Sequence, residues 1–171
     1  MHFLLNKGGL YKVYNGNLLY HGCVPLKEDG NLKSVRIFGH TYKGKGLYEV
    51  LESYVRKGFY AMDSKEKERG KDIMWYIWLS ENSPLFGKDK MATFERYFLA
   101  EKETHKEKKN PYYLLLEDEK VICHILKEFG LENEDAHIIN GHVPVKCKDG
   151  EKPIKCGGKV LVIDGGFSRA Y

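Results

Sequence analysis

The stretch His137-Ile-Ile-Asn-Gly-His142-Val-Pro144 decides how this chain is expected to fold, and Lys159-Val-Leu-Val-Ile-Asp-Gly-Gly166 follows it. A short β-branched run that ends in glycine and histidine predicts a buried strand with an imidazole at its end. An earlier stretch, Asn17-Leu-Leu-Tyr-His21-Gly-Cys-Val-Pro25, again combines an apolar run with a histidine next to a glycine. In α/β folds the loops at strand ends hold functional groups, and glycine removes side-chain bulk there. We therefore expect an α/β fold with His21 and His142 on neighbouring strand-end loops.

Two imidazoles that converge in this way are suited to bind one metal ion. Neutral imidazole nitrogen suits Mn²⁺, Fe²⁺ or Zn²⁺ better than Mg²⁺. Each ligating ring should donate its other N–H to a carbonyl or a carboxylate, and Asp164 is a reasonable acceptor just past the last strand. The alternative for Asp164 is an ordinary turn residue. For His21 or His142 taken alone, a buried structural role is the competing interpretation, and the matched pair favours a metal site.

Composition and charge restrict the class of protein. The chain has 171 residues, of which 42% are hydrophobic, which is enough for the core of one domain or part of one. The formal net charge of +4 suits a small anionic substrate but is too mild to indicate a nucleic-acid-binding protein. No apolar run reaches the roughly 18 residues of a membrane span, and the N-terminus lacks a secretory signal. The four cysteines form no CxxC pair, so we expect reduced thiols and a cytoplasmic protein.

Local patterns predict the remaining elements. An Asn-Gly pair predicts a β-hairpin over residues 10–20. Apolar residues at three-and-four spacing predict amphipathic helices from 46 to 59 and from 117 to 129. Residues 72–79 are apolar on every side and are expected to be buried. Short strands are expected at 136–140, near 143–147 and at 159–163. The turn at 148–151 predicts that the last two strands form a hairpin.

Several longer stretches together resemble one protein family. They are His21-Gly-Cys-Val-Pro25, Asn82-Ser-Pro-Leu-Phe-Gly-Lys-Asp-Lys-Met-Ala-Thr-Phe-Glu-Arg-Tyr-Phe98, Lys108-Lys-Asn-Pro-Tyr112, Ile139-Asn-Gly-His-Val-Pro144 and Val162-Ile-Asp-Gly-Gly-Phe-Ser-Arg-Ala-Tyr171. The chain resembles the class 3 fructose-1,6-bisphosphatases of Firmicutes-type bacteria, in the calcineurin-like metallophosphoesterase superfamily. The resemblance covers residues 1–171 but only the later part of the family's longer sequence. It implies the C-terminal portion of one metallophosphoesterase domain, a layered β-sandwich flanked by helices, without the N-terminal half of the same protein.

The resemblance also implies a site and a reaction. Superfamily members hold two divalent ions through Asp-x-His, Gly-Asp-x-x-Asp and Asn-His motifs and two later histidines. Only the later histidines are matched here, by His21 and His142 as partners at one ion, and Val143-Pro144 stands where the superfamily has a further histidine. The implied reaction is Mn²⁺-dependent hydrolysis of fructose 1,6-bisphosphate to fructose 6-phosphate and phosphate in gluconeogenesis. This portion contributes metal ligands but no other catalytic residue, so we expect it to be inactive alone.

Contacts to the substrate phosphates are expected within residues 82–98, the segment that most specifically resembles the family. Lys88, Lys90 and Arg96 cluster there, and a sugar bisphosphate needs cations at both ends. The alternative is that Glu95-Arg96 is an ordinary exposed ion pair on a short helix. Neither a nucleic acid nor a membrane is expected as a partner, and the oligomeric state is left open.

Two other functions stay open at this point. One is another metallophosphoesterase activity, such as a protein or dinucleotide phosphatase, because metal ligands do not identify a substrate. The other is a basic, aromatic-rich module that binds nucleic acid, for which Tyr42-Lys-Gly-Lys-Gly-Leu-Tyr48 is the best support.

Overall fold

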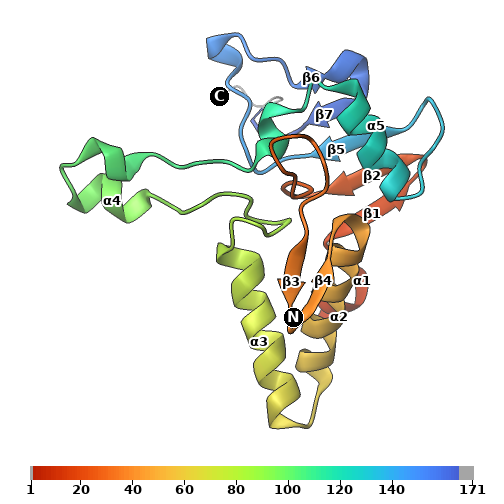
Figure 1. The fold of residues 1–171 in the computed structure, drawn as a ribbon, viewed down its shortest axis with the longest axis vertical. Coiled ribbons are helices and arrows are strands. Elements are labelled where there is room, and N and C mark those ends of the chain that lie inside the picture. Colours follow the sequence, from red (N-terminus) through yellow and green to blue (C-terminus); the bar gives the residue numbers. More distant parts are fainter. Residues whose placement is uncertain (1, 166–171) are drawn as a thin grey trace.

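A five-stranded mixed sheet forms the centre of the computed structural model, which describes residues 2–165 (Figure 1). The strand order is β1-β2-β5-β7-β6, in which β2, β5 and β7 run parallel and both edge strands are antiparallel. The strands are β1 Tyr11–Tyr14, β2 Asn17–Tyr20, β5 His137–Asn140, β6 Ile154–Lys155 and β7 Val160–Val162. The expected α/β class is confirmed. Since β2 and β5 are parallel neighbours, the loops that follow them leave the same edge of the sheet.

The hairpin of β1 and β2 is confirmed at the Asn-Gly pair. Asn15 and Gly16 have φ angles of 48° and 74°, and Tyr14 pairs with Asn17 across the turn. Two consecutive positive φ angles are typical of the tight turn whose twist matches the flanking strands. This local turn sets the register of β2 and so fixes where His21 leaves the sheet.

Helix α5 (Glu119–Glu128) covers one face of the sheet (Figure 1). The Asp118 carboxylate caps its first turn by accepting two backbone N–H groups. Leu18, Ile138 and Val160 of the strands are fully buried in the same core cluster as the helix. The buried residues of the helix are Val121, Ile122, Ile125 and Leu126. The predicted apolar stripe is therefore confirmed.

The opposite face of the sheet carries a row of apolar residues that are only half-buried. Leu19 pairs with Ile139, which pairs with Leu161, so the three side chains lie side by side across the sheet. Ile154 continues the row on β6 and is exposed. The described residues therefore cover one face of the sheet well and the other only partly.

A helical hairpin projects from the sheet (Figure 1). Helices α2 (Gly44–Tyr60) and α3 (Ser64–Leu79) approach so closely that a Cβ on Gly58 would lie 2.5 Å from the Cα of Gly70. A larger side chain at either glycine would push the helices apart. A separate two-stranded sheet consists of β3 (Val35–Ile37) and β4 (His40–Tyr42). Buried residues of β3 form a second, smaller hydrophobic core with those of α2 and α3.

The prediction that residues 72–79 are buried is wrong for most of the segment. Ile73 and Ile77 of α3 face α2 and are buried. Trp75 and Trp78 are 68% and 62% exposed, and Met74 is exposed as well. The reason is that α2 is the main partner of α3, so only one side of the helix has a surface to pack against.

An arm leaves the body after α3 (Figure 1). It carries α4 (Thr93–Phe98) and the short 3₁₀ helix η1 (Lys102–His105), and it returns through Glu107. The backbone N–H of Ala92 donates to the Glu107 carboxylate at 3.0 Å, which ties the two ends of the arm together.

The expected strand near 143–147 is absent from the described structure, and its hairpin with β7 is wrong. His142 has a φ of 66°, and Pro144 has no N–H to donate to a ladder. Strand β6 pairs with β7 instead. The remaining short helices are α1 (His2–Lys7), η2 (Pro111–Leu114), η3 (Cys147–Asp149) and η4 (Cys156–Gly158). Within residues 2–165, no helix combines the length and apolar character needed to cross a membrane.

Candidate metal centre

The two histidine loops meet at one edge of the sheet. His21 follows β2 and His142 lies two residues beyond β5, and Nε2 of His21 is 3.0 Å from Nδ1 of His142. The ring centroids are 4.9 Å apart. The expected convergence of the two imidazoles is confirmed.

Hydrogen bonds between the two loops fix this approach. The Gly141 N–H donates to the His21 carbonyl at 2.9 Å. The Asn140 side-chain amide donates to the Gly22 carbonyl at 3.0 Å, and Asn140 is only 1% exposed. Asn140 is a residue that the sequence analysis missed as part of the site. The alternation of β5 could have found it, since it places Asn140 on the same buried face as Ile138.

A turn at residues 83–86 packs against the two histidine loops. The Cys23 N–H donates to the Pro84 carbonyl at 2.9 Å. Gly22 lies so close to this turn that a Cβ would be 2.5 Å from the Pro84 oxygen. The Phe86 ring is centred 6.3 Å from the His142 ring. Glycine is therefore required at position 22 for the loop to reach this turn.

The surroundings of His142 favour its neutral form. Burial lowers the pKa of His142, and the nearby His21 and Lys88 lower it further. Neutral imidazole is the form that binds a metal ion. Nε2 of His142 is buried and has no hydrogen-bond partner among residues 2–165.

The separation of the ring nitrogens fits shared ligation. Two ligand atoms at neighbouring corners of an octahedron, each about 2.1 Å from the ion, lie about 3.0 Å apart. The same separation also suits a hydrogen bond between neutral rings of suitable tautomers, which is the structural role left open above. Within the described part of the chain, no third His, Cys, Asp or Glu joins the pair to form a group that could hold an ion. The pair can thus supply two ligands of a larger centre.

Asp164 lies beside the histidine loop. A Cβ on Gly141 would be 3.4 Å from the Asp164 Cβ, and the Asp164 carbonyl accepts the Val145 N–H at 2.9 Å. No hydrogen bond joins its carboxylate to either imidazole among the described residues. Its role as an acceptor for a ligating ring stays a prediction.

The three cations predicted to contact phosphate all belong to the arm or its base. Lys88 pairs with Glu107 at 3.2 Å, and Arg96 on α4 pairs with the same carboxylate at 3.5 Å. Lys90 donates to the Thr104 carbonyl at 2.8 Å. Of these three cations, Lys88 is the one whose charge contributes to the lowered pKa of His142. The contact of these residues with phosphate stays a prediction.

Comparison with known proteins decides the family. A family model described as Firmicute fructose-1,6-bisphosphatase matches residues 1–171. The chain belongs to this family. It is 59% identical over 170 residues to the class 3 fructose-1,6-bisphosphatase of Clostridioides difficile, and 57% identical to the corresponding protein of Clostridium acetobutylicum. Each match covers 99% of this chain and 26% of the relative. No solved structure matches the chain.

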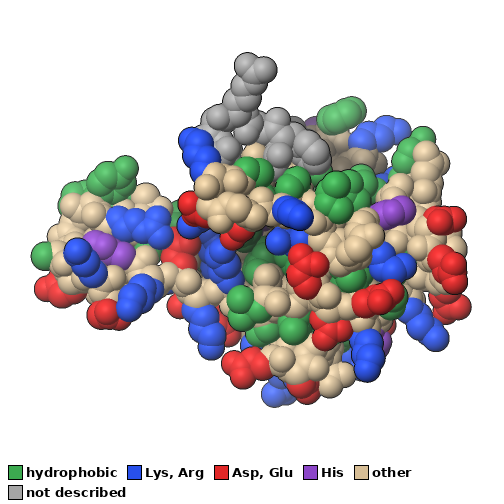
Figure 2. Space-filling model, turned by 90° about the horizontal axis from the view of Figure 1, so that it is seen from above, with side chains coloured by type: hydrophobic (Ala, Val, Ile, Leu, Met, Phe, Trp, Pro, Cys, Tyr) green, Lys and Arg blue, Asp and Glu red, His purple; other side chains and the backbone are tan. Residues whose placement is uncertain are grey.

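This member of the Firmicute fructose-1,6-bisphosphatase family therefore spans about a quarter of the length of the relatives that it matches. The names of these relatives favour neither of the two alternative functions. On the face seen in Figure 2, lysine and arginine side chains are interspersed with aspartate and glutamate. Such mixing is not the one-signed patch that nucleic-acid binding needs.

Proposed function

We propose that this chain supplies His21 and His142 to the divalent-metal site of a class 3 fructose-1,6-bisphosphatase. The activity proposed for the whole enzyme is hydrolysis of fructose 1,6-bisphosphate to fructose 6-phosphate and phosphate. The 3.0 Å approach of the two imidazole nitrogens carries this proposal, together with the names of the relatives. We place the reaction in gluconeogenesis and in the cytoplasm, and we propose Mn²⁺ as the metal because neutral imidazole suits it.

The chain's own residues have defined tasks in this proposal. A bound divalent pair would polarise the phosphoryl group and supply hydroxide at neutral pH. The hydrogen bond from Asn140 to the Gly22 carbonyl holds the two histidine loops together, with one nitrogen of each ring 3.0 Å from the other. Lys88, whose charge contributes to the lowered pKa of His142, is proposed to attract the substrate phosphate. Lys90 and Arg96 are proposed to contact the second phosphate from the arm.

The chain alone is expected to have negligible activity. A catalytic metal site generally needs about three protein ligands and an open position, and the described residues bring together only two. The measurement is Mn²⁺-dependent phosphate release from fructose 1,6-bisphosphate. Robust turnover by the chain that disappears in His142→Ala would contradict the expectation that the two histidines are only part of a larger site, since the chain's own residues would then complete it.

A chimera tests the activity directly. This chain is exchanged for the matching quarter of the Clostridioides difficile enzyme, with which it is 59% identical. We expect an active chimera, and we expect His142→Ala to lower its kcat by about 100-fold or more. His124→Ala, on the exposed side of α5, is the matched control and should leave kcat unchanged. An active His142→Ala chimera would contradict the proposed role.

A further inference from the structure

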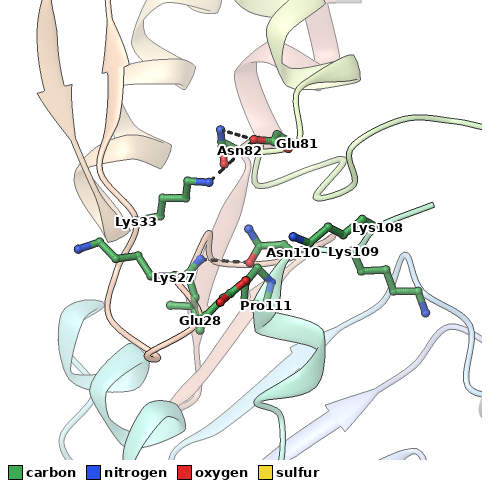
Figure 3. A pocket seen from close by; sticks show the side chains of 10 residues that line it. Lys27, Glu28, Lys33, Glu81, Asn82, Lys108, Lys109, Asn110 and Pro111 are labelled. Atoms are coloured by element: carbon green, nitrogen blue, oxygen red, sulfur yellow. Dashed lines mark hydrogen bonds and ion pairs between the residues drawn. The ribbon is translucent and has the colours of Figure 1, made fainter. Parts of the chain in front are cut away.

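A hollow with an excess of positive charge is lined by residues outside the histidine pair (Figure 3). It is a cavity of about 260 Å³ between the loop after β2, the end of α3 and the segment before η2. Four lysines but only two glutamates line it: Lys27, Lys33, Lys108, Lys109, Glu28 and Glu81. Neither His21 nor His142 belongs to the lining, and neither does Lys88. A concave surface of one dominant charge raises the local concentration of anions.

Asn110 offers this cavity a fixed pair of hydrogen-bond donors. Its side chain is 6% exposed, and its Oδ1 accepts the backbone N–H groups of Leu26 and Tyr112 at 3.1 and 3.0 Å. Because these two bonds fix which end of the amide is oxygen, the NH₂ group must be on the other side. Figure 3 shows this nitrogen directed toward the cavity. Among residues 2–165 no hydrogen-bond acceptor is recorded for it.

Two of the lysines direct their ammonium groups into the space between these segments. In Figure 3 the ammonium group of Lys108 points toward Asn110 and that of Lys33 points toward Glu81 and Asn82, whereas the side chains of Lys27 and Lys109 extend away. The backbone of Lys108 is held on both sides by Asp89, through bonds of 2.7 and 2.9 Å. The ammonium group of Lys33 makes a long ion pair, 3.9 Å, with the carboxylate of Glu81, which is exposed.

An acceptor completes the set. Asn82 lines the same cavity, and its Oδ1 is buried without a hydrogen-bond partner in the described structure. Hydrogen phosphate and a protonated phosphate ester each carry a hydroxyl that can donate to such an oxygen. Two ammonium groups, an amide NH₂ and one acceptor therefore match a phosphate group in both charge and hydrogen-bonding pattern.

We propose that this cavity binds the phosphate group of a small phosphorylated metabolite. Ligand pockets usually measure about 300–1,000 Å³, so this smaller one suits a phosphate with a few carbon atoms. Its lining shares no residue with the histidine pair, and the proposal goes beyond the function proposed above. Its test needs no divalent metal, so failure here would leave the metal assignment untouched.

The experiment is equilibrium dialysis of the chain against radiolabelled inorganic phosphate. A chelator removes divalent metals, and about 0.15 M chloride screens non-specific attraction. Asn110→Asp keeps the acceptor for both backbone N–H groups but replaces the donor with a repelling oxygen. Lys108→Gln removes one ammonium group at an exposed position. Lys27→Gln is the matched control, since it removes the same charge from a side chain that points away.

We expect saturable phosphate binding that weakens about tenfold in Asn110→Asp and in Lys108→Gln, the effect of losing one charge-assisted hydrogen bond. Lys27→Gln and His142→Ala should bind as the wild type does. A second arm replaces phosphate with glycerol 3-phosphate: tighter binding supports an ester as ligand, and equal or weaker binding contradicts a metabolite ester and leaves free phosphate as the ligand. Absence of saturable binding, or equal losses in Lys27→Gln and Lys108→Gln, would overturn the proposal.

Discussion

Gly22 is the residue on which the approach of the histidine loop to its supporting turn depends. A Cβ at this position would lie 2.5 Å from the Pro84 oxygen and 2.8 Å from the Leu85 oxygen. Both neighbours are backbone atoms, which move only if the turn moves. The loop that carries His21 is therefore held by a contact that only glycine permits.

Gly22→Ala is expected to destabilise the chain by about 1–3 kcal/mol, the usual cost of forcing extra volume into a packed site. The midpoint of urea unfolding measures this. Gly46→Ala is the matched control, because nothing lies within 4 Å of its Cβ and alanine is the better residue inside a helix. Equal midpoints for the two variants would mean that the turn yields freely to the extra methyl group.

The convergence of the histidines could be predicted because its signals are local. Each stretch shows an apolar strand, a glycine and a histidine, and parallel pairing of β2 with β5 places both ends at one edge. The part played by Asn140 was missed, because its partner is the Gly22 carbonyl, 118 residues away in sequence. A polar residue at the end of a buried strand gives no local sign of that partner.

At the scale of elements, Glu107 is the residue that closes the arm. Its side chain is 15% exposed. The carboxylate forms ion pairs with Lys88 and Arg96 and accepts a hydrogen bond from the Ala92 N–H. Burial alone would raise the pKa of Glu107, but the hydrogen bonds from Ala92 and Lys88 and the charges of Lys88 and Arg96 together lower it. A carboxylate with a lowered pKa stabilises the folded arm above its unfolded pKa, and that stabilisation is lost as the pH falls through the folded value.

We therefore expect the arm to open as the pH falls below about 4, near the ordinary pKa of glutamate. Hydrogen exchange at the Ala92 amide measures the opening. In Glu107→Gln, which cannot titrate, the protection of this amide should be lower at neutral pH and should change less with pH. If wild type and variant show the same pH dependence, another group closes the arm.

Elements with local signals could be predicted, and those that depend on distant surfaces could not. The Asn-Gly hairpin and the stripe of α5 both formed as expected, because turn chemistry and helical spacing specify them. The strand expected near 143–147 does not form, because Pro144 has no N–H to donate and His142 has a positive φ. Burial of 72–79 failed because sequence shows how apolar a helix is but not how many partners it has.

At the scale of the whole molecule, apolar surface is left without a partner in the described structure. Trp75 and Trp78 are exposed on α3, and Phe94 and Phe98 are exposed on the arm at 72% and 78%. The half-buried row across the sheet adds to this surface. Large contiguous apolar patches are uncommon on monomeric soluble proteins and favour association.

We therefore expect the chain on its own to self-associate and to bind a hydrophobic dye. Size-exclusion chromatography with light scattering measures the first property, and dye fluorescence measures the second. The double change Trp75→Gln and Trp78→Gln should reduce both, while leaving Ile73 and Ile77 to pack against α2. A monodisperse wild-type monomer with a sharp, cooperative thermal transition contradicts this expectation.

The account rests most directly on His21 and His142 binding the same metal ion. Paramagnetic broadening of histidine ring resonances by substoichiometric Mn²⁺ tests it, because this signal reports even weak binding. We predict that the rings of His21 and His142 broaden first and together, that His124 stays sharp, and that His142→Ala removes the preferential broadening of His21. Uniform broadening of all histidines, or selective broadening elsewhere, would contradict the assignment of the metal site.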